Sequence, residues 1–123
     1  MKILINDHRK IFTIQEEFNI VFPYLKLEFF SQPHLKGAEP IQKMIKPDDK
    51  TLAEYRIIHK QGEITISGSM TVADLEQNFF DIYGLEVQIF RKSGKAWLGT
   101  TITDSWTLEE QNKQGESLSK GLV

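Results

Sequence analysis

The 123-residue chain contains no cysteine. This absence excludes disulfide bonds, thiolate zinc sites and cysteine nucleophiles together, and it fits a reducing compartment. Long hydrophobic runs are absent as well. The N-terminal apolar stretch is only Ile3-Leu4-Ile5, and no stretch approaches the roughly 18 apolar residues of a membrane-spanning helix. We therefore expect a cytoplasmic protein with no export signal and no membrane partner.

Neither sign of charge is in excess. The chain has 15 basic and 17 acidic residues and a formal net charge of −2. Binding to nucleic acid requires Lys and Arg to neutralise phosphates, so such a function would have to depend on a local basic patch. The 40% apolar and 26% charged composition is that of an ordinary globular protein. At this length, a single domain buries roughly two-thirds of its unfolded surface.

Familiar catalytic motifs are missing. The sequence has no phosphate-binding P-loop, no dinucleotide-binding glycine fingerprint and no Gly-x-Ser-x-Gly nucleophile elbow. Its histidines, His8, His34 and His59, lie far apart and lack the i, i+4 spacing of a helical metal pair. Acids such as Asp7 and Asp104 lie near expected turns, where Asp bonds to the backbone. We expect no catalytic residue, no metal and no cofactor; a metal site that combines the three histidines is the alternative.

Residues 13–30 and 71–90 follow the same pattern. Each segment begins with a threonine and an acid three residues later, a capping box that satisfies backbone donors at the start of a helix. Apolar residues then recur at helical spacing, and an alternating apolar strand ends each segment. The boxes are Thr13 with Glu16 and Thr71 with Asp74, and the helical stripes are Ile14, Phe18, Val21, Phe22 and Leu25 in the first segment and Val72, Leu75, Phe79, Ile82 and Tyr83 in the second. Gly84 stands where a left-handed helix cap is expected.

Strands are also predicted on either side of these segments. Each helix is expected to follow a hairpin, so that the unit is hairpin, helix and strand. A further turn and strand are expected after the second unit. The predicted strand pairs are 1–6 with 10–13 around a turn at 7–9, and 55–60 with 63–67 around Gln61-Gly62; the further turn is 92–95 and its strand 96–102.

Two more capping boxes occur in the sequence. Thr107 and Glu110 are expected to begin a C-terminal helix, but few apolar anchors follow, so this helix is predicted to be marginal. Thr51 and Glu54 precede residues that we interpret as a strand. Either that strand is wrong or the box caps a single turn.

The connection between the two units, residues 32–50, contains three prolines and no clear periodicity. An irregular segment of this length is functional or flexible, and its large apolar residues indicate that most of it packs on the domain. The predicted fold is one α+β domain, 1–123, with a mostly antiparallel sheet, two main helices on one face and the marginal C-terminal helix. Its divisions are unit one at 1–31, the connection at 32–50, unit two at 51–106 and a tail at 107–123.

One part of the sequence combines cations, hydroxyls and indoles more densely than the rest. Such a mixture can bind a phosphate, a carboxylate or the backbone of a partner, since Trp and Arg often anchor interfaces. The same residues also suit a solvated strand edge, with both indoles in the core. We predict an interaction surface there. Its residues are Arg91, Lys92, Lys95, Trp97, Thr101, Thr103, Asp104 and Trp106.

Two resemblances can be stated. The block Gly84 to Asn112, which begins Gly-Leu-Glu-Val-Gln-Ile-Phe-Arg-Lys-Ser-Gly and ends Thr-Asp-Ser-Trp-Thr-Leu-Glu-Glu-Gln-Asn, resembles a segment of small bacterial proteins of unknown function. It covers about a quarter of the chain and implies no activity. A looser resemblance is to ubiquitin-like β-grasp domains, in which a hairpin leads to a Thr-capped helix and another strand, as expected for 63–90. The chain ends Gly121-Leu122-Val123 without the terminal Gly-Gly of the conjugating members, so modifier chemistry is not expected.

We expect a small cytosolic protein that binds another protein as a non-catalytic interaction or regulatory module. The alternative is a small-ligand-binding protein or an enzyme with a site assembled from distant residues, such as His34 or His59 near the Thr-rich strand. A weak nucleic-acid-binding module, based on the basic tip at 91–95, is the third hypothesis. A cleft with a perturbed His or carboxylate would favour the enzyme, whereas a bare strand edge would favour the interaction module.

Overall fold

A computed structural model describes residues 1–31, 43–46 and 50–120. In these residues all strand pairs are antiparallel, so the expected α+β class with a largely antiparallel sheet is confirmed. In chain order the elements are β1 (Lys2–Ile5), α1 (Ile11–Val21), β2 (Leu25–Phe30), the 3₁₀ helix η1 (Leu52–Tyr55), β3 (Gly62–Thr65), α2 (Val72–Tyr83), β4 (Glu86–Ser93), β5 (Ala96–Gly99) and α3 (Leu108–Lys120).

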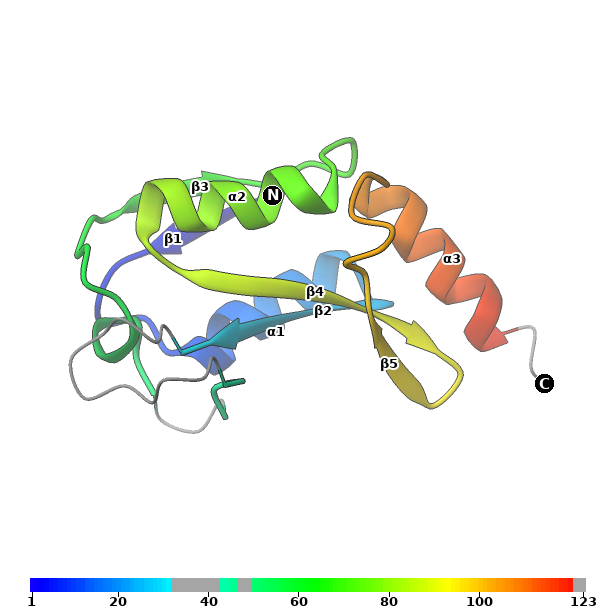
Figure 1. Cartoon of the computed structure of the whole chain (residues 1–123), viewed down its shortest axis with the longest axis horizontal. Coiled ribbons are helices and arrows are strands. Elements are labelled where there is room, and N and C mark those ends of the chain that lie inside the picture. Colours follow the sequence, from blue (N-terminus) through cyan, green and yellow to red (C-terminus); the bar gives the residue numbers. More distant parts are fainter. Residues whose placement is uncertain (32–42, 47–49, 121–123) are drawn as a thin grey trace.

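The strands form two sheets. β1 pairs with β3 in a two-stranded sheet, and the order of the other sheet is β2-β4-β5. The order strand, helix, strand therefore occurs twice, and the two halves pair first strand with first strand and second with second. Figure 1 shows α2 lying along β4, with α3 beyond the N-terminal start of α2 and β5 at the margin of the larger sheet.

One hydrophobic core holds these layers together. The β2 and β4 side chains that face it alternate along each strand, and Glu28 is buried on the other face of β2. The rings of Phe29 in β2 and Phe79 in α2 meet edge to face, with centroids 6.2 Å apart. Phe18 in α1 is also fully buried in the same core. The two main helices therefore pack on one face of this sheet, as predicted.

The sequence predicts both ends of α2 correctly. Its N-cap is Thr71, whose hydroxyl accepts a hydrogen bond from the Asp74 N–H at 3.1 Å. Its C-cap is Gly84, which has the left-handed φ of 63° that favours glycine. Four of the five stripe residues are buried, whereas Ile82 is 40% exposed.

The start of α1 is different. The helix begins at Ile11, its N-cap is Lys10, and no side chain caps it, so the predicted Thr13 box and the strand at 10–13 are wrong. The reason is a contact with a distant segment. The Ile11 N–H donates to the Lys50 carbonyl at 3.0 Å, and Lys10 forms an isolated bridge with Thr51. Since this segment satisfies the Ile11 donor from outside the helix, α1 begins two residues before the threonine.

The predicted hairpin before α2 is also wrong. Residues 56–61 contain no strand, and β3 pairs with β1 instead of with them. The box of Thr51 and Glu54 caps the single turn η1, which is the second of the two interpretations of that box. Because the β-grasp resemblance depended on the hairpin, it loses its structural basis. The later turn is confirmed, with Gly94 at φ 64°, but its second strand ends at Gly99 instead of 102.

The C-terminal helix is better formed and better docked than the expected marginal helix. Its box is formed, since Thr107 N–H donates to Glu110 Oε1 and Glu110 N–H donates to Thr107 Oγ1, both at 3.1 Å. α3 then runs for 13 residues and packs against β4. Besides the apolar anchor Leu108, which is fully buried, α3 buries a polar residue and a glycine: Gln111 is buried, and Gly115 is buried against Tyr24. The expectation of a marginal helix was based on apolar anchors alone and is therefore wrong.

Part of the connection packs on the domain. Ile45 is buried and its N–H donates to the Phe29 carbonyl, while Met44 bridges Phe30. The prediction for most of the remaining connection lies outside the described residues. Among the residues that the structure describes, no helix is long and apolar enough to cross a membrane.

Candidate functional site

The outer side of β5 is an open sheet edge. β5 is the last strand in the order β2-β4-β5, and all four of its residues are exposed. Ala96 and Leu98 face Ser93 and Arg91 across the hairpin. In a two-residue hairpin these are the hydrogen-bonded pairs, so the backbone groups of the intervening Trp97 and of Gly99 point away from β4. The edge therefore offers N–H and C=O groups at alternate residues.

The opposite edge of this sheet is covered. The side-chain amides of Gln15 and Asn19 in α1 donate to the β2 carbonyls of Leu27 and Leu25, at 2.8 and 2.9 Å. Further along, residues 43–45 exchange backbone hydrogen bonds with the end of β2. An exposed sheet edge promotes pairing with strands of other chains. The sheet therefore has one protected edge, at β2, and one edge that is open to such pairing, at β5.

A hollow of about 350 Å³ lies between α1 and the Trp97 side chain of β5. The Lys26 Nζ lies 5.7 Å from the centroid of the Trp97 ring and 2.9 Å from a carboxylate oxygen of Glu28, which is buried. The lining of the hollow therefore includes an indole with the Lys26–Glu28 ion pair beside it. Its lining residues are Phe12, Gln15, Glu16, Asn19, Lys26 and Trp97.

The predicted interaction surface divides into two parts. Arg91 and Lys92 are neighbours in β4, so their side chains leave opposite faces of the strand. Arg91 donates to Gln111 at 2.9 Å and lies over the Trp106 ring, which ties it to α3. Lys92 is instead paired with Trp97 across the β4–β5 hairpin.

The remaining predicted residues also fall into different places. The backbone carbonyls of Asp104 and Trp106 accept hydrogen bonds from the first turn of α2, and Thr103 accepts from Gln111, so these three support the fold locally. Thr101 and Lys95 are exposed. Trp97, Lys92 and Lys95 are thus the part of the predicted set that lies at β5 and its turn.

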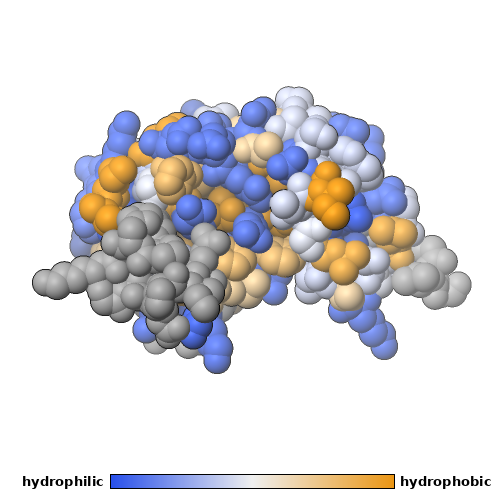
Figure 2. All heavy atoms as spheres, viewed as in Figure 1, coloured by the Kyte–Doolittle hydropathy of each residue, from blue (hydrophilic) through white to orange (hydrophobic). Residues whose placement is uncertain are grey.

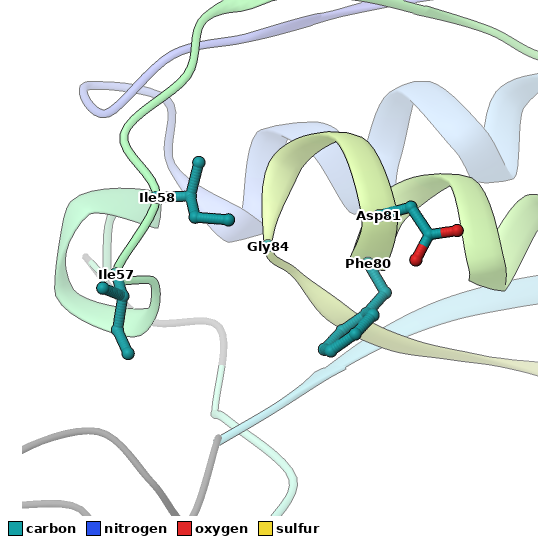
Figure 3. A pocket seen from close by; sticks show the side chains of 5 residues that line it. All are labelled: Ile57, Ile58, Phe80, Asp81 and Gly84. Carbon is teal, nitrogen blue, oxygen red and sulfur yellow. The ribbon is translucent and has the colours of Figure 1, made fainter.

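A second hollow, of about 380 Å³, lies between the segment after η1 and the end of α2. In Figure 3 the side chains of Ile57 and Ile58 stand on one side of it and Phe80 on the other, with Gly84 between them. These three large side chains are 41–57% exposed. Figure 2 shows several separate apolar areas, divided by polar side chains, on the face it presents.

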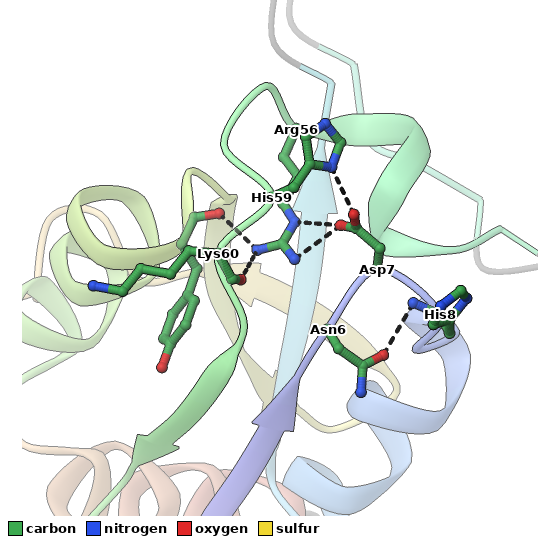
Figure 4. Close-up of polar contacts among 7 residues, drawn as sticks. Asn6, Asp7, His8, Arg56, His59 and Lys60 are labelled. Carbon is green, nitrogen blue, oxygen red and sulfur yellow. Dashed lines mark hydrogen bonds and ion pairs between the residues drawn. The ribbon is translucent and has the colours of Figure 1, made fainter.

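A polar network lies on the same segment. The Arg56 side chain is fully buried, and its guanidinium donates to Asp7 at 3.0 Å and to the carbonyls of Lys60 and Tyr83 at 2.7 and 3.2 Å (Figure 4). The second oxygen of Asp7 lies 2.7 Å from Nδ1 of His59, whose side chain is half exposed. A carboxylate that orients a histidine in this way is the arrangement that general bases use.

Sequence reasoning missed this network. Burial raises the pKa of Asp7, but hydrogen bonds and charge from Arg56 and His59 outweigh it and hold that pKa below its usual range. Asp7 is 49 residues from Arg56 and 52 residues from His59 in sequence, so no local motif could reveal the network. His59 does not contact the Thr-rich strand in any described interaction, His8 bonds through its backbone to Asn6, and His34 lies outside the described residues.

One carboxyl group has an unusual proton affinity. Glu76 in α2 accepts a hydrogen bond from the Ile89 N–H at 3.0 Å. Burial raises the pKa of Glu76 to about 7, the backbone hydrogen bond lowers it, and the nearby charges of Asp104 and Glu86 raise it further. Glu76 therefore changes charge close to neutral pH.

Among the described residues, no group of three or more His, Asp or Glu side chains is placed to hold a metal ion. No known protein family, curated protein or solved structure matches this chain. The functional argument therefore depends on the geometry of these sites.

Proposed function

We propose that the chain is a non-catalytic protein-interaction module that binds an extended segment of another protein along β5. The single observation that carries the proposal is the open edge of β5, whose four exposed residues include no charged side chain. Extended peptides bind such edges by adding a strand, with the backbone supplying affinity and alternate side chains supplying specificity. We also propose the cytosol as its compartment, which agrees with the absence of cysteine.

The contrast between the two sheet edges supports this function. A sheet with no use for its edge is usually protected by Lys, Pro or a covering segment. Here α1 side chains cover β2, while β5 carries only the neighbouring Lys95 at its turn and presents Trp97 and Leu98. Trp is one of the residue types that are enriched among the anchors of protein interfaces.

A matched pair of variants at Gly99 tests the proposal. Gly99→Pro removes an N–H that points away from β4, and Pro is tolerated on an edge strand. Gly99→Ala keeps that N–H, and its added Cβ would meet Phe90 at an ordinary contact distance of 3.9 Å. Gly99 also lacks a positive φ, so Ala does not force a strained backbone there.

The probe is a display library of random extended peptides selected on the parent protein. Selected peptides should bind the parent and Gly99→Ala equally, and bind Gly99→Pro at least about tenfold more weakly, since one backbone hydrogen bond and the strand register are lost. Backbone amide signals of Trp97 and Gly99 should move on binding. Peptides that bind Gly99→Pro with unchanged affinity would show that the edge is not the binding site.

A second candidate function rests on the Asp7–His59 contact of 2.7 Å. We propose it as the alternative because Asp7, which buried Arg56 holds in place, contacts Nδ1 of His59 and no contact of Nε2 is found among the described residues. Such a histidine can act as a general base toward a small substrate beside the hollow at Ile57. A panel of carboxylic and phosphoric esters tests it: turnover by the parent should disappear in His59→Gln while the melting temperature is kept, and the absence of turnover by the parent would count against it.

A further inference from the structure

The open edge of β5 is complementary to itself in one antiparallel register. Its pairing with β4 leaves the N–H and C=O groups of Trp97 and Gly99 directed away from the sheet. When two copies of β5 lie antiparallel, with Trp97 of each copy opposite Gly99 of the other, all of these groups are paired across the two edges. A shift of two residues in either direction would place one of them opposite Lys95 or Thr101, which lie outside β5.

Leu98 lies at the centre of this register. The two copies of Leu98 face each other across a two-fold axis as a non-hydrogen-bonded pair, the kind in which side chains are closer, with Cα atoms about 4.5 Å apart. Leu98 is uncharged and 46% exposed, so the pairing removes apolar surface of both copies from water. Gly99 has no side chain that could collide with the indole opposite it. Trp97 can therefore keep its position beside Lys26.

No like charges oppose each other in this arrangement. β5 itself contains no charged residue, and Lys95, which precedes it, is three residues from the axis. The two copies of Lys95 therefore lie at opposite ends of the paired strands. Lysine commonly protects an edge strand from pairing. Here its position at the turn leaves the residues that pair without such protection.

We propose that β5 pairs with β5 of a second copy of this chain about a two-fold axis at Leu98, which joins two three-stranded sheets edge to edge. The inference goes beyond the proposed function, because it names a different occupant of the same edge. The contact uses one short strand from each copy, whereas a stable interface has about 20–30 residues a side. The dimer is therefore weak and transient, and a partner segment that binds to β5 displaces the second copy.

Sedimentation velocity and a charge swap at the axis test the proposal. The average mass of the parent should rise toward that of two chains between roughly 10 µM and 1 mM, the range of weak complexes. Leu98→Lys and Leu98→Glu should each raise the dimer dissociation constant at least about tenfold, because like charges meet at the axis. An equimolar mixture of the two variants should associate again, since a lysine then faces a glutamate.

Leu4 provides the matched control. It is a strand leucine of nearly the same exposure, at 48% in β1. Leu4→Lys and Leu4→Glu should associate as the parent does, both separately and when mixed. Thermal denaturation of the Leu98 variants should match that of the parent monomer, because the side chain they replace is exposed.

The outcomes separate this inference from the proposed function. A parent that stays monomeric up to about 1 mM, Leu98 variants that associate as the parent does, or a mixture that associates no more than either variant alone would overturn the β5 dimer. Selected peptides whose binding depends on Gly99 would then still support the β5 edge as a binding site. Those peptides should convert the dimer to monomers, because both ligands use the outward backbone groups of Trp97 and Gly99. A dimer that persists when such peptides saturate the protein would also overturn the inference.

Discussion

The helices α1 and α2 occupy equivalent places in the two strand-helix-strand halves, but their starts are specified differently. Thr71 caps α2 through the Asp74 N–H, and the preceding strand β3 ends close by in sequence. Lys10 precedes α1 with no side-chain cap, and the Ile11 N–H is satisfied by Lys50, 39 residues away. One helix boundary is thus encoded locally and the other by a tertiary contact. The comparison teaches that a capping motif predicts a helix start only where no distant segment supplies the same hydrogen bonds.

The largest expected effects lie in the shared core and test whether the two helices contribute equally. Phe18 in α1 and Phe79 in α2 are both fully buried. Phe18→Ala and Phe79→Ala should each lower the free energy of unfolding by about 3–5 kcal/mol, because each leaves a cavity. Urea denaturation measures both values. A loss below about 1 kcal/mol for either variant would show that the corresponding helix is not packed as described.

The next prediction concerns the long-range contact between Asp7, which precedes α1, and Arg56, which follows η1. Arg56→Met removes the fully buried guanidinium that joins Asp7 to the carbonyls of Lys60 and Tyr83. We expect a loss of about 3 kcal/mol, because Asp7 is left without its main partner. The pKa of folded Asp7 is lowered, so its stabilisation is present above its unfolded pKa and is lost as the pH falls through the folded value.

Denaturation of the parent and of Arg56→Met at a series of pH values checks this expectation. The difference in unfolding free energy should be largest near neutral pH and should shrink in acid. Lys60→Met is the matched control, since the network uses only its backbone carbonyl. A difference that does not change with pH would show that Arg56 acts by packing alone.

A smaller effect tests the contact of α2 with β4. The folded pKa of Glu76 is raised from 4.5 to about 7, so the folded state keeps a proton that the unfolded state has already released. Stability contributed by this proton is fully present below about 4.5 and is lost as the pH rises toward 7. Glu76→Gln keeps an acceptor for the Ile89 N–H and cannot ionise.

We compare the free energy of unfolding of Glu76→Gln with that of the parent at each pH. This difference should be more favourable to the variant at pH 8 than at pH 4, by on the order of 1–3 kcal/mol. Thermal and urea denaturation across this range measure the difference. Glu109→Gln, an exposed carboxyl on α3, should show no such trend. Parallel pH profiles for the parent and Glu76→Gln would contradict the raised pKa.

The sequence allows the α+β class, α2 and most residues of the two buried stripes to be predicted, since these follow from periodicity and from caps that lie within a few residues. Val21 and Ile82 are the exceptions, at 46% and 40% exposed. The sequence does not allow the pairing of β3 with β1 or the start of α1 to be predicted, because both depend on segments far apart in the chain. The same limit applies to the sites. Trp97 could be named from composition, but its separation from Arg91 depends on strand alternation, and the Asp7–His59 contact joins residues 52 positions apart. The docking of α3 was missed because Gln111 and Gly115 carry no hydrophobic signal.

The smallest predicted effect tests the comparison of the two helix starts directly. Thr71→Ala removes the hydroxyl that accepts from Asp74 and should cost about 1 kcal/mol. Thr13→Ala replaces an exposed residue inside α1, where it caps nothing and where Ala has the higher helix propensity, so stability should change by less than about 0.5 kcal/mol or rise slightly. Urea denaturation of both variants gives the two numbers side by side. Equal losses would mean that Thr13 caps α1 in solution and that the contact with Lys50 does not set the start of the helix.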